Sequence, residues 1–357
     1  MKKVFAIVIV LALVFALAAC SGGGGSSAAP ADTGSAAPVD EGSGGGASGE
    51  AIKVGIVNLP PEESGYRQAN VEDMNEVFSA ANGYDAKQSN AADNSEQIAA
   101  AEGYIRDGVD YLLISAANAT GWDGVLASAK EAGVTVFLFD RFIETDESNY
   151  QAALVSNTYE EGQTAVDWLL GQGLDAYNVI LIRGQIGSAA EIGRSDAVEK
   201  ADEAGDLTIV ADGTGGDTWS DVEARKVVEA AITGGVDFNV IYAENDGMAQ
   251  GAVKALDAAG ISHGKGGDVI IMGFDFNRFA LREVQAGNWN YDGQCNPRQA
   301  SKIAEWIQTI ESGEEPPVGT VYLDEIGVDT DSITEDDILE RGINEDPGVV
   351  ESVNEAA

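Results

Sequence analysis

The 357-residue sequence is poor in histidine, cysteine and basic side chains. Its single histidine and two cysteines exclude a histidine-rich metal site and a disulfide-stapled scaffold. Lysine and arginine number 20 against 60 aspartate and glutamate residues, so the formal net charge is −40. Such a chain repels phosphates, which argues against nucleic-acid binding and against docking on anionic lipid through a basic face. A Ser-His-Asp triad would have to use His263.

The first twenty residues differ from the rest of the chain. Lys2 and Lys3 precede an apolar run of about 16 residues that ends at Ala19, which predicts a secretory signal peptide over residues 1–20. The run is short for a bilayer-spanning helix, which needs about 20 residues. The small residues before Cys20 resemble a bacterial lipobox, so we expect Cys20 to be lipidated. The alternative is an ordinary signal in which Cys20 is incidental.

Residues 21–50 are almost entirely Gly, Ser, Ala, Pro and a few acids. Such a segment cannot bury enough apolar area to offset the entropy of ordering it, so we predict a disordered tether. The globular body then begins near Ala51. With 44% hydrophobic residues overall, the chain has enough apolar material for real cores, and the length of the body suggests two domains.

Short apolar runs alternate with amphipathic stretches along the body. The predicted strands lie near 52–59, 110–115, 134–140, 151–155, 178–183, 207–211, 238–243, 268–275 and 289–295. The predicted helices lie near 65–81, 122–132, 159–171, 189–204, 220–233, 247–259, 277–286 and 298–312. This alternation is typical of parallel sheets with helices on both faces. So many strands favour two doubly wound α/β lobes over the alternative, one barrel of eight βα units.

Several predicted strands run directly into polar residues. The strand at 134–140 ends in Asp140 and is followed by Arg141, the strand at 238–243 runs into 244–246, and Asp275 ends another. In open α/β sheets, ligands bind beyond the carboxyl ends of the strands. Carboxylates, a guanidinium and an amide in one crevice are suited to hydrogen-bonding many hydroxyl groups in a fixed geometry.

Eight short segments follow one another in a specific order and spacing: Glu63–Arg67, Ala119–Trp122, Val136–Arg141, Ala190–Arg194, Gly216–Trp219, Tyr242–Ala249, Gly273–Asp275 and Gln294–Pro297. Together they resemble the type I periplasmic binding proteins of sugar ABC importers, in the ribose-binding group, and most closely the galactofuranose-binding type. The resemblance covers the body from about Lys53 to Leu323. It implies two lobes, 51–156 with 297–323 and 157–296 with 324–357. Three crossings, near 156–157, 294–297 and 323–324, would form the hinge.

This resemblance also implies ligand contacts. Asp140 and Arg141 match a pair that grips ring hydroxyls, and Tyr66 and Trp219 match aromatics that cover the sugar. The full implied set is Tyr66, Arg67, Asp140, Arg141, Arg194, Asp217, Trp219, Asn245, Asp275 and Gln294. Tyr66 stands where the galactofuranose type has tryptophan, and Gln294 stands where it has glutamate, so the exact sugar stays open.

Some of these side chains have a purely structural alternative. Asp140 and Arg141 could form a surface ion pair, Trp219 could be a core aromatic, and Asn245 could cap the helix that begins at Asp246. Trp122 is expected to pack rather than to contact ligand.

The resemblance implies an extracytoplasmic lipoprotein that captures a monosaccharide, galactofuranose-, galactose- or ribose-like, and delivers it to an ABC permease. We expect a monomer with no catalytic activity, no cofactor, no metal and no nucleic-acid partner. One alternative is a sugar sensor that presents its bound ligand to a chemoreceptor or sensor kinase. Another is a glycoside hydrolase that uses two of the carboxylates. A transcription regulator of the same lobe fold is excluded by the secretion signal.

Overall fold

The structure, a computed structural model, describes residues 51–216 and 219–344, and all of these belong to one compact unit. The predicted signal peptide with Cys20, the predicted tether and Asp217 lie outside the described residues. Within the described ranges, no helix combines the length and the apolar character that crossing a membrane requires.

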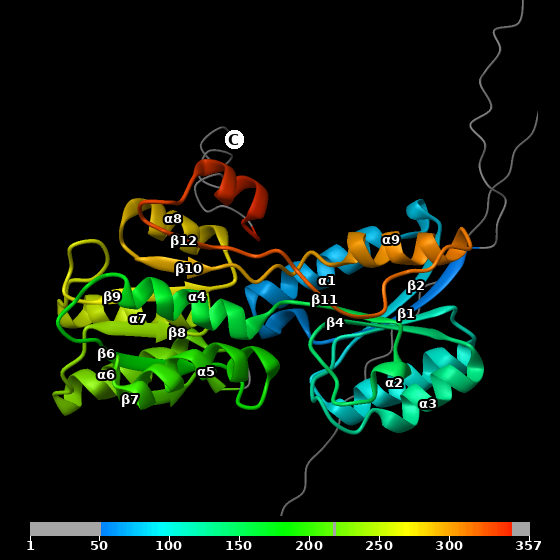
Figure 1. The fold of residues 1–357 in the computed structure, drawn as a ribbon, viewed down its shortest axis with the longest axis horizontal. Coiled ribbons are helices and arrows are strands. Elements are labelled where there is room, and N and C mark those ends of the chain that lie inside the picture. The colour runs from blue at the N-terminus through cyan, green and yellow to red at the C-terminus, as the bar shows by residue number, and fades with distance from the viewer. Residues whose placement is uncertain (1–50, 217–218, 345–357) are drawn as a thin grey trace, which may run out of the picture. The chain divides into compact units, whose positions relative to one another are not determined.

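Two six-stranded sheets form the framework (Figure 1). The first has the order β11-β5-β4-β3-β1-β2 and is parallel throughout, and the second has the order β12-β10-β9-β8-β6-β7 with only β12 antiparallel. The strands of the first are β1 (Ile52–Asn58), β2 (Tyr84–Asn90), β3 (Tyr111–Ile114), β4 (Thr135–Asp140), β5 (Ala152–Val155) and β11 (Gly319–Tyr322). Those of the second are β6 (Asn178–Arg183), β7 (Thr208–Thr214), β8 (Val240–Ala243), β9 (Ile270–Phe274), β10 (Tyr291–Gly293) and β12 (Gly327–Asp329). The predicted pair of doubly wound sheets is confirmed, and the barrel alternative is wrong.

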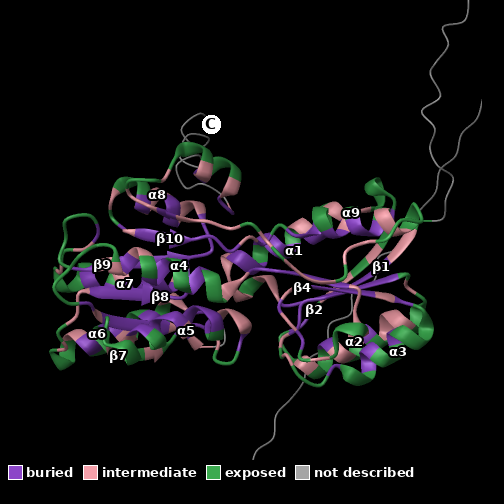
Figure 2. Cartoon of the chain, viewed as in Figure 1, coloured by how far each residue is buried: buried purple, intermediate pink, exposed green. Residues whose placement is uncertain are grey.

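Helices cover both faces of each sheet. On the first sheet, α1 (Gly65–Val77) and α9 (Ala300–Glu311) pack on one face, and α2 (Asn94–Asp107) and α3 (Asp123–Ala132) pack on the other (Figure 1). On the second sheet, α4 (Thr158–Leu170) and α5 (Ala189–Ala204) lie opposite α6 (Asp221–Gly234), α7 (Asp246–Ala259) and α8 (Arg278–Ala286). The central strands are therefore buried on both sides (Figure 2), which explains why their sequences are apolar throughout.

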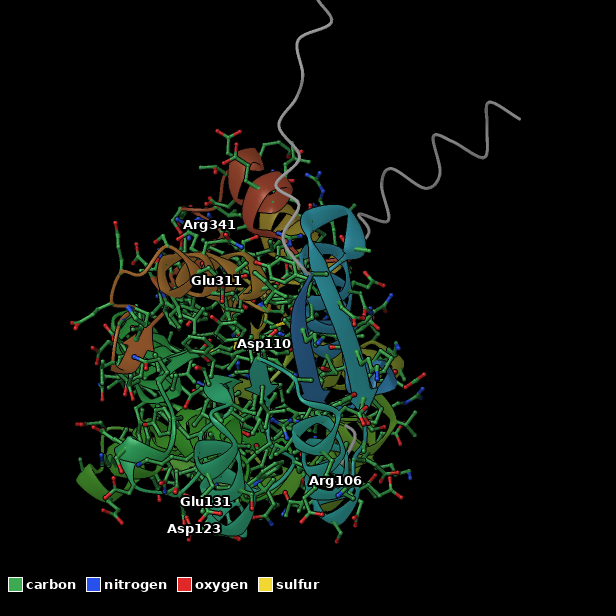
Figure 3. All side chains as sticks on the ribbon, turned by 90° about the vertical axis from the view of Figure 1, so that its right-hand side faces the viewer. Arg106, Asp110, Asp123, Glu131, Glu311 and Arg341 are labelled. Carbon is green, nitrogen blue, oxygen red and sulfur yellow. The ribbon has the colours of Figure 1, made fainter. Side chains whose placement is uncertain are left out.

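Charged side chains lie mainly on the outer faces of the helices. Figure 3 shows Arg106 on α2 and Asp123 and Glu131 on α3, and all three are exposed. The packed interior of the first sheet is apolar and aromatic instead, with the rings of Phe137 and Trp306 centred 5.7 Å apart. The acidic composition is thus largely a property of the surface, and the buried acids described below are exceptions.

Three strands and one helix were not predicted. β2 is an edge strand that pairs only with β1, and its sequence Tyr-Asp-Ala-Lys-Gln-Ser-Asn is too polar for a buried-strand pattern. Strands β11 and β12 have only four and three residues. Helix α2 fully buries only two residues, Gln97 and Ala101, and its start is fixed locally by Asp93, whose side chain accepts from the backbone N–H groups of Ser95 and Glu96.

The chain passes between the two sheets three times. The first crossing, residues 156–157, joins β5 to α4; the second, 294–299, joins β10 to α9; the third, 323–326, joins β11 to β12. These positions agree with the crossings that the resemblance implied. The three segments meet one another, because Glu325 Oε1 in the third accepts from Ser156 Oγ in the first at 2.8 Å and from Asn296 N in the second at 2.5 Å.

Candidate ligand-binding site

A cavity is lined by residues that follow strands of both sheets. Eight of the predicted ligand contacts line it: Tyr66, Arg67, Asp140, Arg141, Arg194, Trp219, Asn245 and Asp275. The remaining lining consists of Glu63, Ser64, Phe142, Ser156, Thr158, Ala189, Ala190 and Cys295. The carboxyl-end rule for parallel sheets therefore locates this cavity correctly.

Asp140 is the centre of the polar network on the first-sheet side. Its Oδ2 accepts from Arg67 Nη2 at 2.5 Å and from Ser115 Oγ at 2.6 Å, and its Oδ1 accepts from Tyr66 OH at 3.0 Å. Burial alone would raise the pKa of Asp140, but the charges of Arg67 and Arg141 outweigh burial and hold this pKa below its ordinary value. Asp140 is therefore a carboxylate at neutral pH and acts only as an acceptor.

Glu63 completes this network, although it is not among the predicted ligand contacts. It accepts from Arg67 Nε at 3.0 Å and from Arg141 Nη2 at 2.7 Å. Asp140 and Arg141 are neighbours in sequence, but their charged atoms are 3.8 Å apart at best, and each has a closer partner elsewhere. The surface-pair alternative for Asp140 and Arg141 is wrong, since both side chains are 10% exposed. The observable signal for Glu63 was its i, i+4 spacing from Arg67.

Arg194 of α5 organises the second-sheet side. Its Nε donates to Glu161 Oε2 at 2.8 Å, its Nη2 donates to Asp275 Oδ1 at 3.3 Å, and its Nη1 donates to the backbone carbonyl of Glu244. The guanidinium carbon also lies 4.7 Å from the centre of the Phe274 ring, a cation–π geometry. Burial raises the pKa of Asp275 to about 7, because Arg194 compensates the carboxylate only in part.

Three cavity residues have a backbone conformation that non-glycine residues rarely adopt. Asp140, Trp219 and Asp275 have φ values of 62°, 49° and 106°. Such conformations cost free energy and persist where the surrounding structure enforces them, often at binding sites. Asp140 adopts this conformation at the end of β4, where Asp140 and the following Arg141 have different closest partners.

Trp219 and Asn245 have structural contacts as well as positions on the cavity wall. Trp219 packs in the core of the second sheet, and a Cβ at Gly184 would come within 1.9 Å of its ring, so residue 184 has to be glycine. Asn245 caps α7, with its Oδ1 accepting from Met248 N at 2.8 Å. Trp122 packs as expected: it is 1% exposed, and its Nε1 donates to the carbonyl of Asn118 at 2.9 Å.

Of the two remaining predicted contacts, one lies elsewhere and one lies outside the described residues. Gln294 does not line the cavity; Gln294 faces a neighbouring cavity near the second crossing, and its Oε1 accepts from Arg341 Nη1 at 2.9 Å. Asp217 lies outside the described residues.

Comparison with known proteins gives one family. Residues 54–315 match the family described as periplasmic binding protein domain. The galactofuranose-binding protein of Escherichia coli is 30% identical over 203 residues, which are 55% of this chain and 63% of that protein. The fructose import binding protein of Bifidobacterium longum is 27% identical over 78% of this chain and 86% of its own length.

Solved structures agree with this result. A Mycobacterium smegmatis protein in complex with beta-D-fucofuranose superposes with a TM-score of 0.70 at 29% identity, covering 79% of this chain and 92% of that one. A galactofuranose-binding protein superposes with a TM-score of 0.71 at 25% identity, covering 78% and 95%. The fold, the family match and the relatives together show that this chain is a binding protein rather than an enzyme, and that it belongs to the periplasmic binding protein family.

Proposed function

We propose that this protein captures a neutral monosaccharide, in its furanose ring form, within the cavity described above. The observation that carries the proposal is the alternating network of Glu63, Arg67, Asp140 and Arg141 at the end of β4. The network is internally neutral, so it offers charged hydrogen-bonding groups without requiring a charged ligand. The name of the Escherichia coli relative and the ligands named for the two solved structures support a furanose.

Each kind of side chain in the cavity makes a different kind of contact with the sugar. Asp140 accepts from sugar hydroxyls, while Arg141 and Arg194 donate from opposite sides of the cavity. Asn245 and Asp275 add polar contacts from the second sheet. Tyr66 and Trp219 offer ring faces to the C–H groups of the sugar, although Tyr66 also donates to Asp140. Arg67 is 1% exposed and fully engaged with protein groups, so its main role is to hold Asp140 in place.

The rest of the proposal concerns delivery. The lobes comprise 51–156 with 297–323, and 157–296 with 324–357, and sheet membership supports this division. Closure about the three crossings traps the sugar, and the closed protein presents it to the permease of an ABC importer. The protein acts outside the cytoplasm, tethered by a lipid on Cys20.

A thermal-shift screen followed by calorimetry tests the binding proposal. The panel is a set of pentoses and hexoses, each with methyl glycosides locked as furanose or pyranose. A sugar present at 100 times its Kd stabilises the folded state by about 2.7 kcal/mol. We expect a stoichiometric response to a furanose and none to its pyranose isomer. Turnover of the glycoside, or no shift with any sugar, would contradict the proposal.

A further inference from the structure

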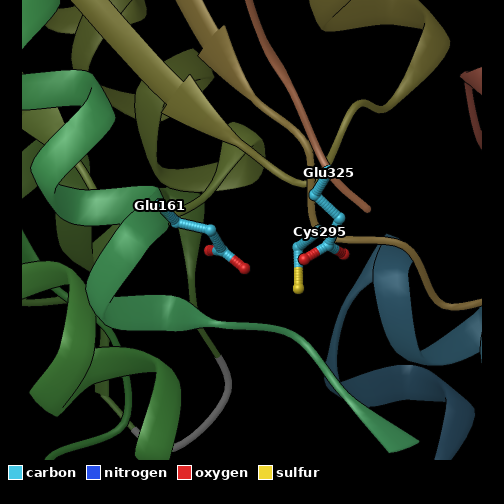
Figure 4. A group of neighbouring side chains, drawn as sticks. All are labelled: Glu161, Cys295 and Glu325. Atoms are coloured by element: carbon cyan, nitrogen blue, oxygen red, sulfur yellow. The ribbon is translucent and has the colours of Figure 1, made fainter. Parts of the chain in front are cut away.

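Three side chains with metal-binding atoms meet at the interlobe crossings. Glu161 lies on the first turn of α4, Cys295 in the second crossing and Glu325 in the third. One ligand atom from each lies within 4.8 Å of the other two. Figure 4 shows the Glu161 carboxylate pointing towards Cys295 and Glu325. Tetrahedral zinc separates its ligands by about 3.5 Å, so small side-chain rotations suffice to bring these atoms into range.

One oxygen of this group is buried without a hydrogen-bond partner. Glu161 is 8% exposed, and Arg194 engages only its Oε2. The other oxygen, Oε1, finds no partner among the described residues. An unsatisfied buried carboxylate oxygen is costly, and native structures rarely leave one without a water, an ion or a ligand. Because the Glu161 carboxylate points towards Cys295 and Glu325 (Figure 4), an ion held between the three side chains would supply the missing partner.

The other two ligands are held in position by the chain. Glu325 Oε1 accepts from Ser156 Oγ and from the backbone N–H of Asn296. Cys295 is buried and unpaired, with its Sγ 3.4 Å from Ser156 Oγ. Hydrogen bonds that fix the orientation of a ligand are typical of built metal sites.

An acidic cavity leads to the group. Its volume is about 150 Å³, and its lining includes Glu160, Glu161, Asp324 and Glu325 but no lysine or arginine. A chain with a formal charge of −40 also concentrates cations at its surface.

We propose that Glu161, Cys295 and Glu325 form a binding site for a thiophilic divalent cation of the Zn²⁺ type, with water in the fourth position. A sulfur ligand disfavours Mg²⁺ and Ca²⁺, which take oxygen ligands. On binding, the Cys295 S–H bond breaks and the Glu325 carboxyl group, whose pKa burial raises to about 8, gives up its proton as well. Both protons pass to solvent as the sulfur–metal and oxygen–metal bonds form. The thiolate and the Glu325 carboxylate balance the dication, while Arg194 already balances Glu161. The sequence had led us to expect no metal, because the three ligands are far apart in the chain.

Such an ion would tie together segments whose relative motion opens the cavity. Cys295 and Glu325 lie in two of the crossings, and Glu325 is bonded to Ser156 in the first. Glu161 also holds Arg194, which lines the sugar cavity. This effect on the hinge rests on the proposed sugar function, whereas metal binding itself does not, so the two are tested separately.

The direct test is cobalt spectroscopy on the full chain carrying Cys20→Ala, which leaves Cys295 as its only thiol. Titration with Co²⁺ should give one equivalent of a sulfur-to-cobalt charge-transfer band. Zn²⁺ should abolish the band, and a large excess of Mg²⁺ should not. Absence of the band, or binding of Co²⁺ without it, would overturn the proposal. The titration leaves the three proposed ligands unchanged, so its outcome does not depend on whether a site variant folds.

Matched variants locate the site. Cys295→Ser should remove the band, and Glu325→Gln should weaken Co²⁺ binding at least about tenfold, as expected when a ligand or its support is lost. Asp324→Asn removes the same charge one residue away, from the same cavity, and should leave the affinity within about twofold. Equal losses in the Asp324 and Glu325 variants would reduce the effect to general acidic attraction and overturn the proposal.

Discussion

The two sides of the proposed sugar-binding cavity differ in how their buried charges are balanced. On the first-sheet side, two carboxylates, Glu63 and Asp140, meet two guanidinium groups, Arg67 and Arg141. On the second-sheet side, Arg194 faces Glu161 and Asp275 while further acids lie buried behind it. Among the described residues, the first side is charge-matched and the second has an excess of carboxyl groups.

Because the two sides differ in charge balance, the pKa values of their buried acids shift in opposite directions. Asp140, opposite two arginines, has its pKa held below the ordinary value. On the second side, burial raises the pKa of Glu244 to about 8, against hydrogen bonds from Ser195 and Gly184 that lower it. Burial and the neighbouring Asp275 raise the pKa of Asp246 well above its ordinary value, and burial and Asp246 do the same for Asp292. The first side thus relies on ion pairs, whereas the second combines the ion pairs of Arg194 with buried acids whose pKa values are raised.

The largest expected effect on stability comes from removing one of the two arginines that balance the carboxylates of the first-sheet side. Arg67→Met leaves Glu63 and Asp140 without their shared partner in a buried setting, so the free energy of unfolding should fall by about 3–5 kcal/mol. Denaturant unfolding of the sugar-free protein measures this. Arg106→Met is the control, because its pair with Glu102 is long and exposed, and this change should have little effect. Equal stability of the two variants would mean that the first side is not held by ion pairs.

Asp140→Asn should weaken sugar binding, and because it also takes one of the two carboxylate partners from the buried Arg67, it should lower the free energy of unfolding as well. The amide keeps the size of the side chain but loses the charge, and a hydrogen bond to a charged group contributes about 1.5–3 kcal/mol, or tenfold to a hundredfold in affinity. Calorimetry with the sugar identified in the screen measures the loss. Asp123→Asn on the exposed face of α3 is the control. Unchanged affinity in the Asp140 variant would remove this residue from the site.

The buried acids of the second-sheet side should make the free energy of unfolding depend on pH. With its folded pKa near 8 and an ordinary value of 4.5, Glu244 binds more proton in the folded than in the unfolded state between these pH values. Its contribution is therefore complete below about pH 4.5 and is lost as pH rises to about 8, at no more than about 1.4 kcal/mol per pH unit.

Glu244→Gln should flatten that decline without abolishing it, because Asp246 and Asp292 contribute in the same direction. Unfolding free energies measured from pH 5 to 8 test this, with the exposed Glu131→Gln as control. An identical slope in wild type and the Glu244 variant would show that Glu244 is charged when folded.

Much of the fold was predictable because its signals are local. The apolar run of β4 ends in Asp140, and the carboxyl-end rule placed that residue at a cavity without any knowledge of the structure. The polar strand β2 was missed because it lies at the edge of the sheet, where it pairs only with β1 and most of its residues are not buried. Its sequence therefore has no buried-strand pattern. Strand prediction from apolar runs thus fails where burial is one-sided.

The partners within the site were harder to predict. Adjacent in sequence, Asp140 and Arg141 seemed a natural pair, but the closest carboxylate to Arg141 is that of Glu63, and Asp140 bonds to Arg67 instead. The excess of buried acid on the second side depends on which of many acids the fold encloses, and composition cannot distinguish Asp246 from an exposed aspartate. Contacts between distant segments, such as Glu161 with Arg194, have no sequence signal in a single chain.

The central claim, that a neutral sugar binds in this cavity beside a charge-matched network, is tested most directly by calorimetric titration at low and high salt. Despite the formal charge of −40, the affinity for the furanose should be the same at both salt concentrations, because a neutral ligand has no charge for salt to screen. One sugar should bind per chain. A tenfold or larger loss of affinity in high salt would contradict the account and indicate a cationic ligand.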